Sequence, residues 1–394
     1  VEDGDYVEKD QAIAEVDSDK ATLELPAEAS GIITLMAKEG DAVAVGAVVC
    51  LIDTSAAKPS GDAPKVEVKE ETPKVEEKIL RIIKEMEYEP NFIARALSSK
   101  KKYTVAVLIP DESYDNYWFA PKEGIKKSFK ELKQFGLDVK FYFFDPYTAS
   151  SFVDKASELT LDNPDGIILT PIFHREVLPY FENWKKSDIP FVIFNTEIPD
   201  FEPLSYIGQD SYQSGYLAGK LIHYGLSEPC TILIAHFDEE TTNAVHLEKK
   251  ENGFRNYFLQ NNLSQKYKIL RVEITRPNYA AFVAQMDNVF ESNPDIKGVF
   301  VTTSKAFEIA SYFNQKHIQD INIVGYDLLS KNLHYLKNNT ISFLINQNPK
   351  GQGYWSLKLM TDKIIFNKEV PLLKYLPLDI ITKENANYFT EEVI

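Results

Sequence analysis

Apolar segments with two different periods alternate from residue 103 to the end of the chain. Short runs of β-branched and aromatic residues, typical of buried strands, are separated by longer segments with apolar residues at helical spacing. In the first half of this region the predicted strands are 105–110, 138–144, 166–171 and 191–195, with helices over 122–134 and 151–161. The alternation predicts βαβ units and therefore parallel sheets.

A second series of the same kind begins after residue 207. It contains predicted helices at 214–224 and 252–261, and predicted strands at 231–237, 268–275, 298–304 and 321–327. Two consecutive doubly wound halves predict an α/β fold with two lobes, each built on a doubly wound parallel sheet. Ligands of open α/β sheets bind outside the carboxyl ends of the strands. We therefore expect a ligand cleft between the lobes, lined by the loops that follow the strands.

Those loops hold the residue types that a sugar site needs. Tyr117 and Trp118 offer ring faces for stacking, and Asp115 and Asn116 beside them offer hydrogen-bonding groups for hydroxyls. Packing within the lobe is the alternative role of the Tyr-Trp pair. Asp327 ends the last predicted strand, and because a buried aspartate is costly without partners we expect ligand or local donors to hold it. Other strand ends add the candidates Phe173, Asn195, Thr196 and Thr303.

The segment 88–111 leads into the first of these strands. Pro90 and Asn91 interrupt a preceding helix, because proline removes a hydrogen-bond donor and disfavours helix at its neighbour. A short helix over 92–98 and three lysines follow, which gives a local positive charge in an acidic chain. The pattern Tyr-x-Pro-Asn-x-x-Ala-Arg-x-Leu, then a basic turn and Val-Ala-Val-Leu-Ile-Pro, resembles the hinge of LacI/GalR-family transcription regulators.

This resemblance implies a homodimer whose hinge helices lie in the minor groove of operator DNA. The family's wedge position, which unstacks a base step and bends the duplex, is occupied here by Leu97. Ala94 and Arg95 allow close backbone approach and a phosphate contact, and Asn91 completes the expected DNA-binding hinge.

The resemblance extends over residues 78–394 and implies a periplasmic-binding-protein-like effector domain. Lys250 stands three residues before Gly253-Phe254, where the family commonly has arginine, and Thr303 stands where asparagine or aspartate is more usual. Asp327 in Val-Gly-Tyr-Asp and Gln347 in Gln-x-Pro match the family pattern. The lysine and the threonine leave two alternatives open, a different sugar or a ligand of another class.

Residues 1–54 have a different, all-β pattern with an internal repeat. Gly-Asp-x-Val at 4–7 and again at 40–43 is followed each time by an apolar strand, which predicts a flattened barrel with approximate twofold symmetry. An Asp-rich turn between the copies places Lys20 at a hairpin tip. The segment resembles a lipoyl domain of the dihydrolipoamide acyltransferases that lacks its leading strand. This resemblance implies lipoate on Lys20. A biotin carrier fits less well, because methionines do not flank the lysine, and Lys20 as an ordinary surface residue is the alternative.

Residues 55–77 form an Ala/Pro/charge-rich linker that is too polar to build a core. An amphipathic helix begins at residue 78, and by resemblance it is the last helix of the regulator's DNA-reading head. We expect residues 78–102 to be a remnant of that helix-turn-helix head plus the hinge helix, with the recognition helix missing, and residues 103–394 to be the effector domain. Two partial modules then meet near residues 76–79, as in a fusion or chimera.

Charge and cysteine content limit the remaining choices. The net charge of −16 argues against a general nucleic-acid binder, and residues 1–78 account for −11 of it, with 8 lysines and 19 acidic residues. Cys50 and Cys230 suggest no disulfide framework, and no apolar run approaches the roughly 20 residues that cross a bilayer. With Val1 first and no signal peptide, we expect a cytoplasmic protein without membrane partners whose true start is missing.

Catalysis is not expected. The six histidines lack metal-ligand spacing, and neither Gly-x-Ser-x-Gly nor a phosphate-binding Gly-rich loop is present. We expect the acidic cluster around His236 to line the cleft or its rim. The predicted function is a LacI-type regulator with a small-ligand effector, most simply a sugar, and no metal or catalytic residue. The alternatives are a sugar-binding receptor of the same fold without DNA function, and a lipoyl acyl-carrier fragment acting through Lys20.

Overall fold

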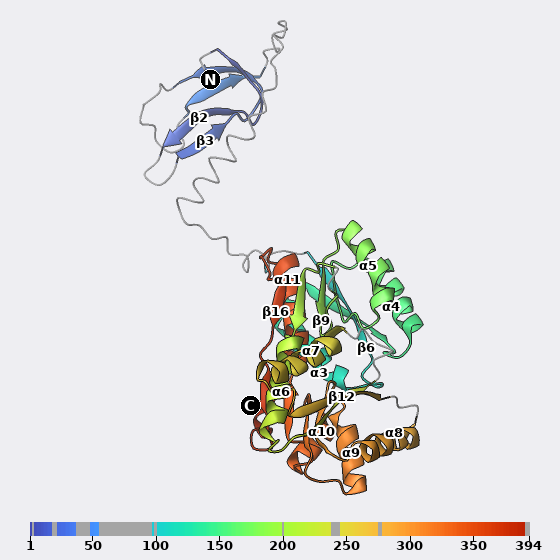
Figure 1. Cartoon of the computed structure of the whole chain (residues 1–394). Coiled ribbons are helices and arrows are strands. Elements are labelled where there is room, and N and C mark those ends of the chain that lie inside the picture. The colour runs from blue at the N-terminus through green and yellow to red at the C-terminus, as the bar shows by residue number, and fades with distance from the viewer. Residues whose placement is uncertain are drawn as a thin grey trace. The chain divides into compact units, whose positions relative to one another are not determined.

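The computed structural model describes residues 1, 4–17, 22–36, 48–54, 97, 101–198, 201–237, 245–274 and 278–390. The chain divides into two compact units, unit 1 (Val1–Glu89) and unit 2 (Pro90–Ile394) (Figure 1). The predicted linker and the amphipathic helix after it lie outside the described residues.

Unit 1 is a small all-β module of short antiparallel strands. Its strands are β1 (Tyr6–Val7), β2 (Ala12–Asp17), β3 (Thr22–Pro26), β4 (Gly31–Leu35) and β5 (Cys50–Asp53), arranged as a sheet β1-β4-β5 and a pair β2-β3. Val7, Ile13, Ala27 and Ile33 form its buried core. Asp17 pairs with Thr22, so Lys20 belongs to the connection between β2 and β3. Lys20 itself and the second Gly-Asp-x-Val copy lie outside the described residues.

Unit 2 has two lobes, each built on a six-stranded sheet. The lobe 1 sheet has the order β16-β10-β9-β8-β6-β7, and all its pairings are parallel. Helices α4 and α5 cover one face and α3 and α11 the other (Figure 1). The strands are β6 (Tyr103–Pro110), β7 (Leu137–Phe144), β8 (Gly166–Leu169), β9 (Phe191–Phe194), β10 (Ser205–Gly208) and β16 (Leu373–Tyr375). The helices are α3 (Phe119–Leu132), α4 (Ala149–Leu161), α5 (His174–Lys186) and α11 (Pro349–Ile364).

The lobe 2 sheet has the order β12-β11-β13-β14-β15-β17, parallel except for the last pair. Helices α6 and α7 lie on one face and α9 and α10 on the other. The strands are β11 (Cys230–Phe237), β12 (Tyr267–Ile274), β13 (Ile296–Val301), β14 (Asn322–Tyr326), β15 (Phe343–Asn346) and β17 (Asp379–Ile381). The helices are α6 (Ser211–Tyr224), α7 (Val245–Gln260), α8 (Tyr279–Ser292), α9 (Ala306–Lys316) and α10 (Ser330–Lys337), with a terminal turn α12 (Asn387–Thr390).

The chain crosses between the lobes three times, after β10, after β15 and after β16. The predicted fold class, two lobes on doubly wound parallel sheets preceded by a small all-β module, is therefore confirmed. The prediction of two consecutive halves was incomplete, because α11 and β16 return to lobe 1 after lobe 2 has formed. Helix α7 also begins at Val245, seven residues before its predicted start.

Helices α6 and α7 approach each other backbone to backbone, and two glycines allow this. A Cβ atom on Gly215 would lie 1.8 Å from the carbonyl oxygen of Lys250, and one on Gly253 would lie 1.9 Å from that of Tyr212. Both distances are far inside van der Waals contact, so a side chain at either position would force the helices apart. This close contact fixes the position of Lys250 on α7.

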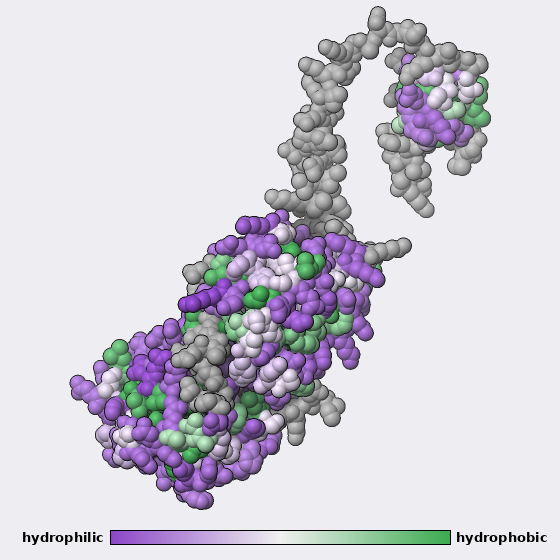
Figure 2. All heavy atoms as spheres, turned by 90° about the vertical axis from the view of Figure 1, so that its right-hand side faces the viewer, coloured by the Kyte–Doolittle hydropathy of each residue, from purple (hydrophilic) through white to green (hydrophobic). Residues whose placement is uncertain are grey.

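The surface of unit 2 shown in Figure 2 is mainly hydrophilic, with apolar side chains in small separate patches. None of the helices in the part of the chain that the structure describes is both long and apolar enough to span a bilayer. Over the same residues, no three His, Cys, Asp or Glu side chains are grouped to hold a metal ion.

Candidate ligand-binding cleft

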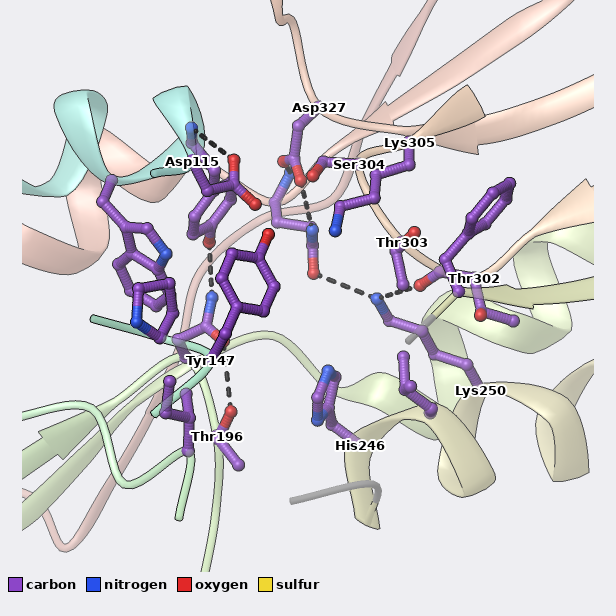
Figure 3. Close-up of a pocket in the computed structure, with 18 residues that line it drawn as sticks. Asp115, Tyr147, Thr196, His246, Lys250, Thr302, Thr303, Ser304, Lys305 and Asp327 are labelled. Atoms are coloured by element: carbon purple, nitrogen blue, oxygen red, sulfur yellow. Dashed lines mark hydrogen bonds between the residues drawn. The ribbon is translucent and has the colours of Figure 1, made fainter. Parts of the chain in front are cut away.

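A cleft opens between the lobes of unit 2, where the carboxyl ends of both sheets face each other (Figure 3). Its empty volume, including the open mouth, is about 830 Å³. Side chains from both lobes line it, so a ligand bound here would contact both.

Asp327 forms the centre of the lobe 2 wall. It follows β14 in a left-handed backbone conformation (φ 64°), which turns its carboxylate toward the cleft side of the sheet. The side chain is buried, and the side-chain amide nitrogen of Gln347 donates to it at 2.6 Å. Burial raises the pKa of Asp327, and the nearby charge of Lys250 opposes this rise. The expectation that local donors hold this carboxylate is met by Gln347.

Lys250 is buried beside Asp327, which is rare for a lysine. Its ammonium group donates to the carbonyl oxygen of Thr302 at 2.9 Å and to the side-chain oxygen of Gln347 at 3.2 Å. It also lies 3.7 Å from the centroid of the Tyr326 ring, a close cation–π contact. Burial lowers the pKa of Lys250, and the Asp327 carboxylate opposes this effect.

The amide of Gln347 therefore bridges the two buried charges (Figure 3). Its nitrogen donates to Asp327 and its oxygen accepts from Lys250, so both charges are compensated without direct contact. Gln209 also donates to the Gln347 oxygen. Gln209 follows β10 and Gln347 follows β15, so this contact joins two of the three crossings between the lobes.

The lobe 1 wall is aromatic and neutral in its deeper part. Tyr117 and Trp118 pack edge to face with centroids 4.9 Å apart, and each is 7% exposed. Asn195 donates to the Tyr117 hydroxyl, and Thr196 donates to the Asn195 side-chain oxygen at 3.2 Å. Asp115 caps the short helix that carries the two rings by accepting from the backbone N–H of Tyr117 at 3.0 Å. The two rings thus pack within lobe 1 and also face the cleft.

The loop after β13 offers a polar atom without a partner. The hydroxyl oxygen of Thr303 is buried and has no hydrogen-bond partner among the residues that the structure describes. Thr303 lines the cleft, and buried hydroxyls are normally satisfied by protein, water or ligand. A ligand hydroxyl in the cleft could supply the missing hydrogen bond.

The structure brings most of the predicted pocket residues together. Nine of the eleven line this cleft: Asp115, Tyr117, Trp118, Asn195, Thr196, Lys250, Thr303, Asp327 and Gln347. Asn116 lies instead beside an adjoining space at the mouth. Phe173 does not line the cleft, because its ring packs in the lobe 1 core, 5.9 Å from Phe152 and 6.2 Å from Phe144. Ligand contact by the nine stays a prediction.

Sequence reasoning missed half of the lining. The additional residues are Pro146, Tyr147, Ile172, Phe237, His246, Leu247, Thr302, Ser304 and Lys305. Pro146 and Tyr147 follow β7, so the rule that ligands lie beyond strand ends would have found them. His246 and Leu247 lie in the first turn of α7, which was predicted to begin later.

His236 lies behind the cleft wall. It is fully buried at the end of β11, with one ring nitrogen 2.8 Å from Glu251 and the other 3.2 Å from the Thr302 hydroxyl. The acidic residues 238–240 that suggested a cluster lie outside the described residues. In the predicted DNA-binding hinge, Asn91, Ala94 and Arg95 are also outside, and Leu97 is helical with 53% of its surface exposed.

The cleft and the fold together define the class of protein. The chain belongs to the family described as periplasmic binding protein domain, whose model matches residues 105–368. Within that fold it is similar to LacI-type regulators. A solved structure described as a proposed LacI transcriptional regulator from Bacteroides fragilis is 31% identical, with a TM-score of 0.68, and covers 73% of this chain and 99% of that chain. The ribose import binding protein RbsB of Bacillus subtilis is 21% identical over 291 residues, 73% of this chain and 89% of that protein.

Unit 1 has relatives of its own. Residues 1–52 match the family described as biotin-requiring enzyme. A 70-residue segment is 41% identical to the dihydrolipoyllysine-residue succinyltransferase component of the Bacillus subtilis 2-oxoglutarate dehydrogenase complex, and it spans 17% of that protein's length. The predicted resemblances, to LacI-type regulators for unit 2 and to a lipoyl domain for unit 1, are confirmed by these matches.

Proposed function

We propose that unit 2 is the effector-binding domain of a LacI-type transcription regulator and that a sugar is its effector. The observation that carries the proposal is the cleft itself, where a buried carboxylate, a buried ammonium group and amide groups converge beside two aromatic rings. Such a combination offers hydrogen bonds to hydroxyls and apolar faces to a sugar ring. The similarity to a LacI-type structure and to a ribose import binding protein supports the same ligand class.

Sugar binding would act by favouring one arrangement of the lobes. A ligand that contacts both walls stabilises the closed state by its differential affinity for that state. In the proposed homodimer, lobe closure changes the spacing of the two hinge helices at residues 92–98 and thereby their fit to operator DNA. The effector and the DNA are then coupled through one two-state element, as allostery requires. This function places the protein in the cytoplasm.

A thermal-shift screen of the full chain tests the ligand. Ribose, glucose, galactose, xylose and arabinose, with their phosphates, are the first probes. Binding to the folded state raises its melting temperature by mass action, and we expect at least one sugar to raise it by about 3 °C at saturation. Asp327→Asn should abolish that shift. The variant Asp154→Asn, at an exposed position of α4 that does not line the cleft, is the matched control. A panel without any shift would contradict a sugar effector.

Selection from random DNA duplexes tests the regulatory role. The chain is incubated with the pool in the presence and absence of the sugar identified above, and bound duplexes are sequenced. Because the recognition helix is expected to be missing, the regulator should enrich a palindromic site only weakly, through its hinge helices, and a change of this weak enrichment with sugar supports the regulator. The second candidate, a sugar-binding receptor without DNA function, is favoured by the similarity to the ribose import binding protein. It predicts tight sugar binding with no enriched DNA sequence.

We further propose that Lys20 of unit 1 accepts lipoate. The similarity to an acyltransferase lipoyl segment and the placement of Lys20 between paired strands β2 and β3 support this. Incubation with a lipoate ligase, lipoate and ATP should add the mass of one lipoyl group, and Lys20→Arg should prevent the addition. An unchanged mass for the parent chain would contradict the proposal.

A further inference from the structure

A second space adjoins the cleft at its mouth. It has an empty volume of about 860 Å³, and it shares Asp115, Tyr147 and Lys305 with the inner cleft. Because three lining residues are common to both, the two spaces lie side by side, and we call them together the groove. We call the two parts the inner chamber and the outer chamber.

The outer chamber is lined from both lobes by aromatic and polar side chains. Tyr114 and Asn116 come from the loop after β6 in lobe 1, and Phe307 and Lys331 come from the first turns of α9 and α10 in lobe 2. Tyr114 is 53% exposed and Tyr147 is 46% exposed, so each has a large apolar surface that faces water. Exposed aromatic rings beside amide and ammonium groups provide the two contacts that a sugar ring makes, one apolar and one polar.

Tyr147 stands at the junction of the two chambers. Figure 3 shows its ring projecting into the groove from lobe 1, and the Lys305 ammonium of lobe 2 lies 5.9 Å from the ring centroid. Because Tyr147 lines both chambers, a ligand that occupies both would lie beside this ring. The chambers also differ in chemistry: the inner one holds the buried charges of Lys250 and Asp327, whereas the outer one holds solvent-exposed rings.

We propose that the outer chamber is a second saccharide subsite, so that the effector is an oligosaccharide of at least two units. This inference rests on the proposed function, since it assigns the first sugar ring to the inner chamber. The inner ring is selected by hydrogen bonds to buried groups, and the next ring stacks on the aromatic side chains of the outer chamber. Because both lobes line the outer chamber, the second ring also adds to the stabilisation of the closed state.

Isothermal titration calorimetry of the full chain with sugars of increasing length tests the proposal. The probes are glucose, maltose and maltotriose; glucose, cellobiose and cellotriose; and xylose, xylobiose and xylotriose. In at least one series the disaccharide should bind about tenfold more tightly than the monosaccharide. The trisaccharide should bind at least as tightly as the disaccharide.

Two variants locate this gain in the outer chamber. Phe307→Ala and Tyr114→Ala should each weaken disaccharide binding about fivefold and leave monosaccharide binding unchanged. Tyr388→Ala removes an aromatic side chain that is 78% exposed and lies outside both chambers, and it should change neither affinity. Unchanged melting temperatures show that the variants are folded.

The outcomes separate this inference from the function on which it rests. If monosaccharides bind as tightly as longer sugars in every series, the subsite is overturned while sugar binding stands. The subsite is likewise overturned if Phe307→Ala and Tyr114→Ala weaken mono- and disaccharide binding equally. If no sugar of any length binds, the proposed effector and the subsite both fail.

Discussion

The two lobes of unit 2 share one architecture but present different chemistry to the cleft. Each has a six-stranded sheet and a pair of helices that touch through glycines: Gly215 and Gly253 join α6 to α7, and Gly124 and Gly353 join α3 to α11. Lobe 2 places two buried charged groups at the deep end of the cleft. Lobe 1 places aromatic and amide side chains there.

The two lobes therefore have the same fold but present different chemical groups to the cleft. Buried charges need fixed partners, and lobe 2 supplies them through Gln347 and the Thr302 carbonyl oxygen. Lobe 1 instead presents the rings of Tyr117 and Trp118 and the amide of Asn195, and Asp115 is its charged group in the lining. If the proposed effector binds here, the buried charges of lobe 2 would select its polar groups and the rings of lobe 1 would pack against its apolar face.

We expect the largest effect from a substitution that breaks the glycine contact between two helices of one lobe. In Gly253→Ala the new Cβ atom would lie 1.9 Å from the carbonyl oxygen of Tyr212, so α7 must move away from α6 and displace Lys250. We expect a loss of about 3–5 kcal/mol in the free energy of unfolding, measured by urea denaturation, and loss of ligand binding. Gly353→Ala in lobe 1, with its Cβ 2.0 Å from the Pro121 carbonyl oxygen, should cost a similar amount.

Gly298→Ala is the control for those two variants. The nearest atoms to its Cβ atom would be side-chain carbons, first the Ile222 methyl at 3.0 Å, so the cost should be well below that of the two helix glycines, whose Cβ atoms meet backbone oxygens. Equal losses of stability for all three substitutions would contradict the prediction that the close helix contacts make Gly253 and Gly353 intolerant of a side chain.

The second prediction concerns the buried charges of lobe 2. Lys250→Met leaves the Asp327 carboxylate buried without its opposite charge, and we expect a loss of about 3 kcal/mol in the free energy of unfolding. The double variant Lys250→Met, Asp327→Asn removes both charges and should recover most of that loss, as a double-mutant cycle would measure. Additive losses in the double variant would show that the two groups do not interact.

The third prediction concerns the pH dependence of stability that arises from Glu251, which contacts His236 behind the lobe 2 wall of the cleft. Burial raises the pKa of Glu251, but hydrogen bonds from His236 and Arg255 outweigh burial and lower it to about 2. The stabilisation that this carboxylate provides is present above its ordinary pKa, 4.5, and is lost as the pH falls toward 2. We expect Glu251→Gln to remove on the order of 2 kcal/mol at pH 7 and to flatten the pH dependence of unfolding between these values.

Glu123→Gln is the control for the pH prediction, because its carboxylate pairs with Lys126 on the surface of α3. Its unfolding free energy should stay within about 0.5 kcal/mol of the parent chain, since exposed pairs contribute little. A parallel pH profile for Glu251→Gln and the parent would contradict the role of Glu251.

The smallest expected effect tests the contact between the lobes at the cleft rim. Lys249 of lobe 2 forms an ion pair with Glu197, which follows β9 in lobe 1. Partly exposed pairs contribute less than about 1 kcal/mol, so Glu197→Gln should weaken ligand binding only two- to threefold in calorimetry. The effect should fade at high salt, because added ions screen the pair. If the effect of Glu197→Gln does not change with salt concentration, the ion pair with Lys249 is not its cause.

Much of the fold could be predicted because its strands are continuous apolar runs. The segments that form β6, β11 and β14 could be assigned as strands from their own residues, without knowledge of tertiary contacts. The return of α11 and β16 to lobe 1 could not be predicted from the local hydrophobic pattern. The pattern of residues 349–375 predicts a helix and a strand but does not indicate which of the two sheets they join. Their placement depends on contacts such as that of Gly353 with the Pro121 carbonyl oxygen, which are distant in sequence.

The site was predictable where position along a strand decides it. Asn195 and Asp327 follow strands in left-handed conformations, which are common for Asn and Asp, and both face the cleft. Phe173 follows a strand too, but loop position does not fix the direction of a side chain, and its ring packs in the core. The burial of Lys250 gave no local signal, since the neighbouring Lys249 is partly exposed at the rim.

The hydrogen bond between Gln347 and Asp327 has a consequence for selectivity. Any ligand group that takes this carboxylate oxygen must displace the amide at 2.6 Å or share the oxygen with it. A ligand donor that displaces the amide gains only the difference between the two bonds, whereas a donor that shares the oxygen leaves the Gln347 bond in place. An apolar ligand that pushed the amide aside would leave both Asp327 and the Gln347 amide without these partners, and buried polar groups without partners are costly. The hydrogen bond between Gln347 and Asp327 thus disfavours apolar ligands at this point of the cleft.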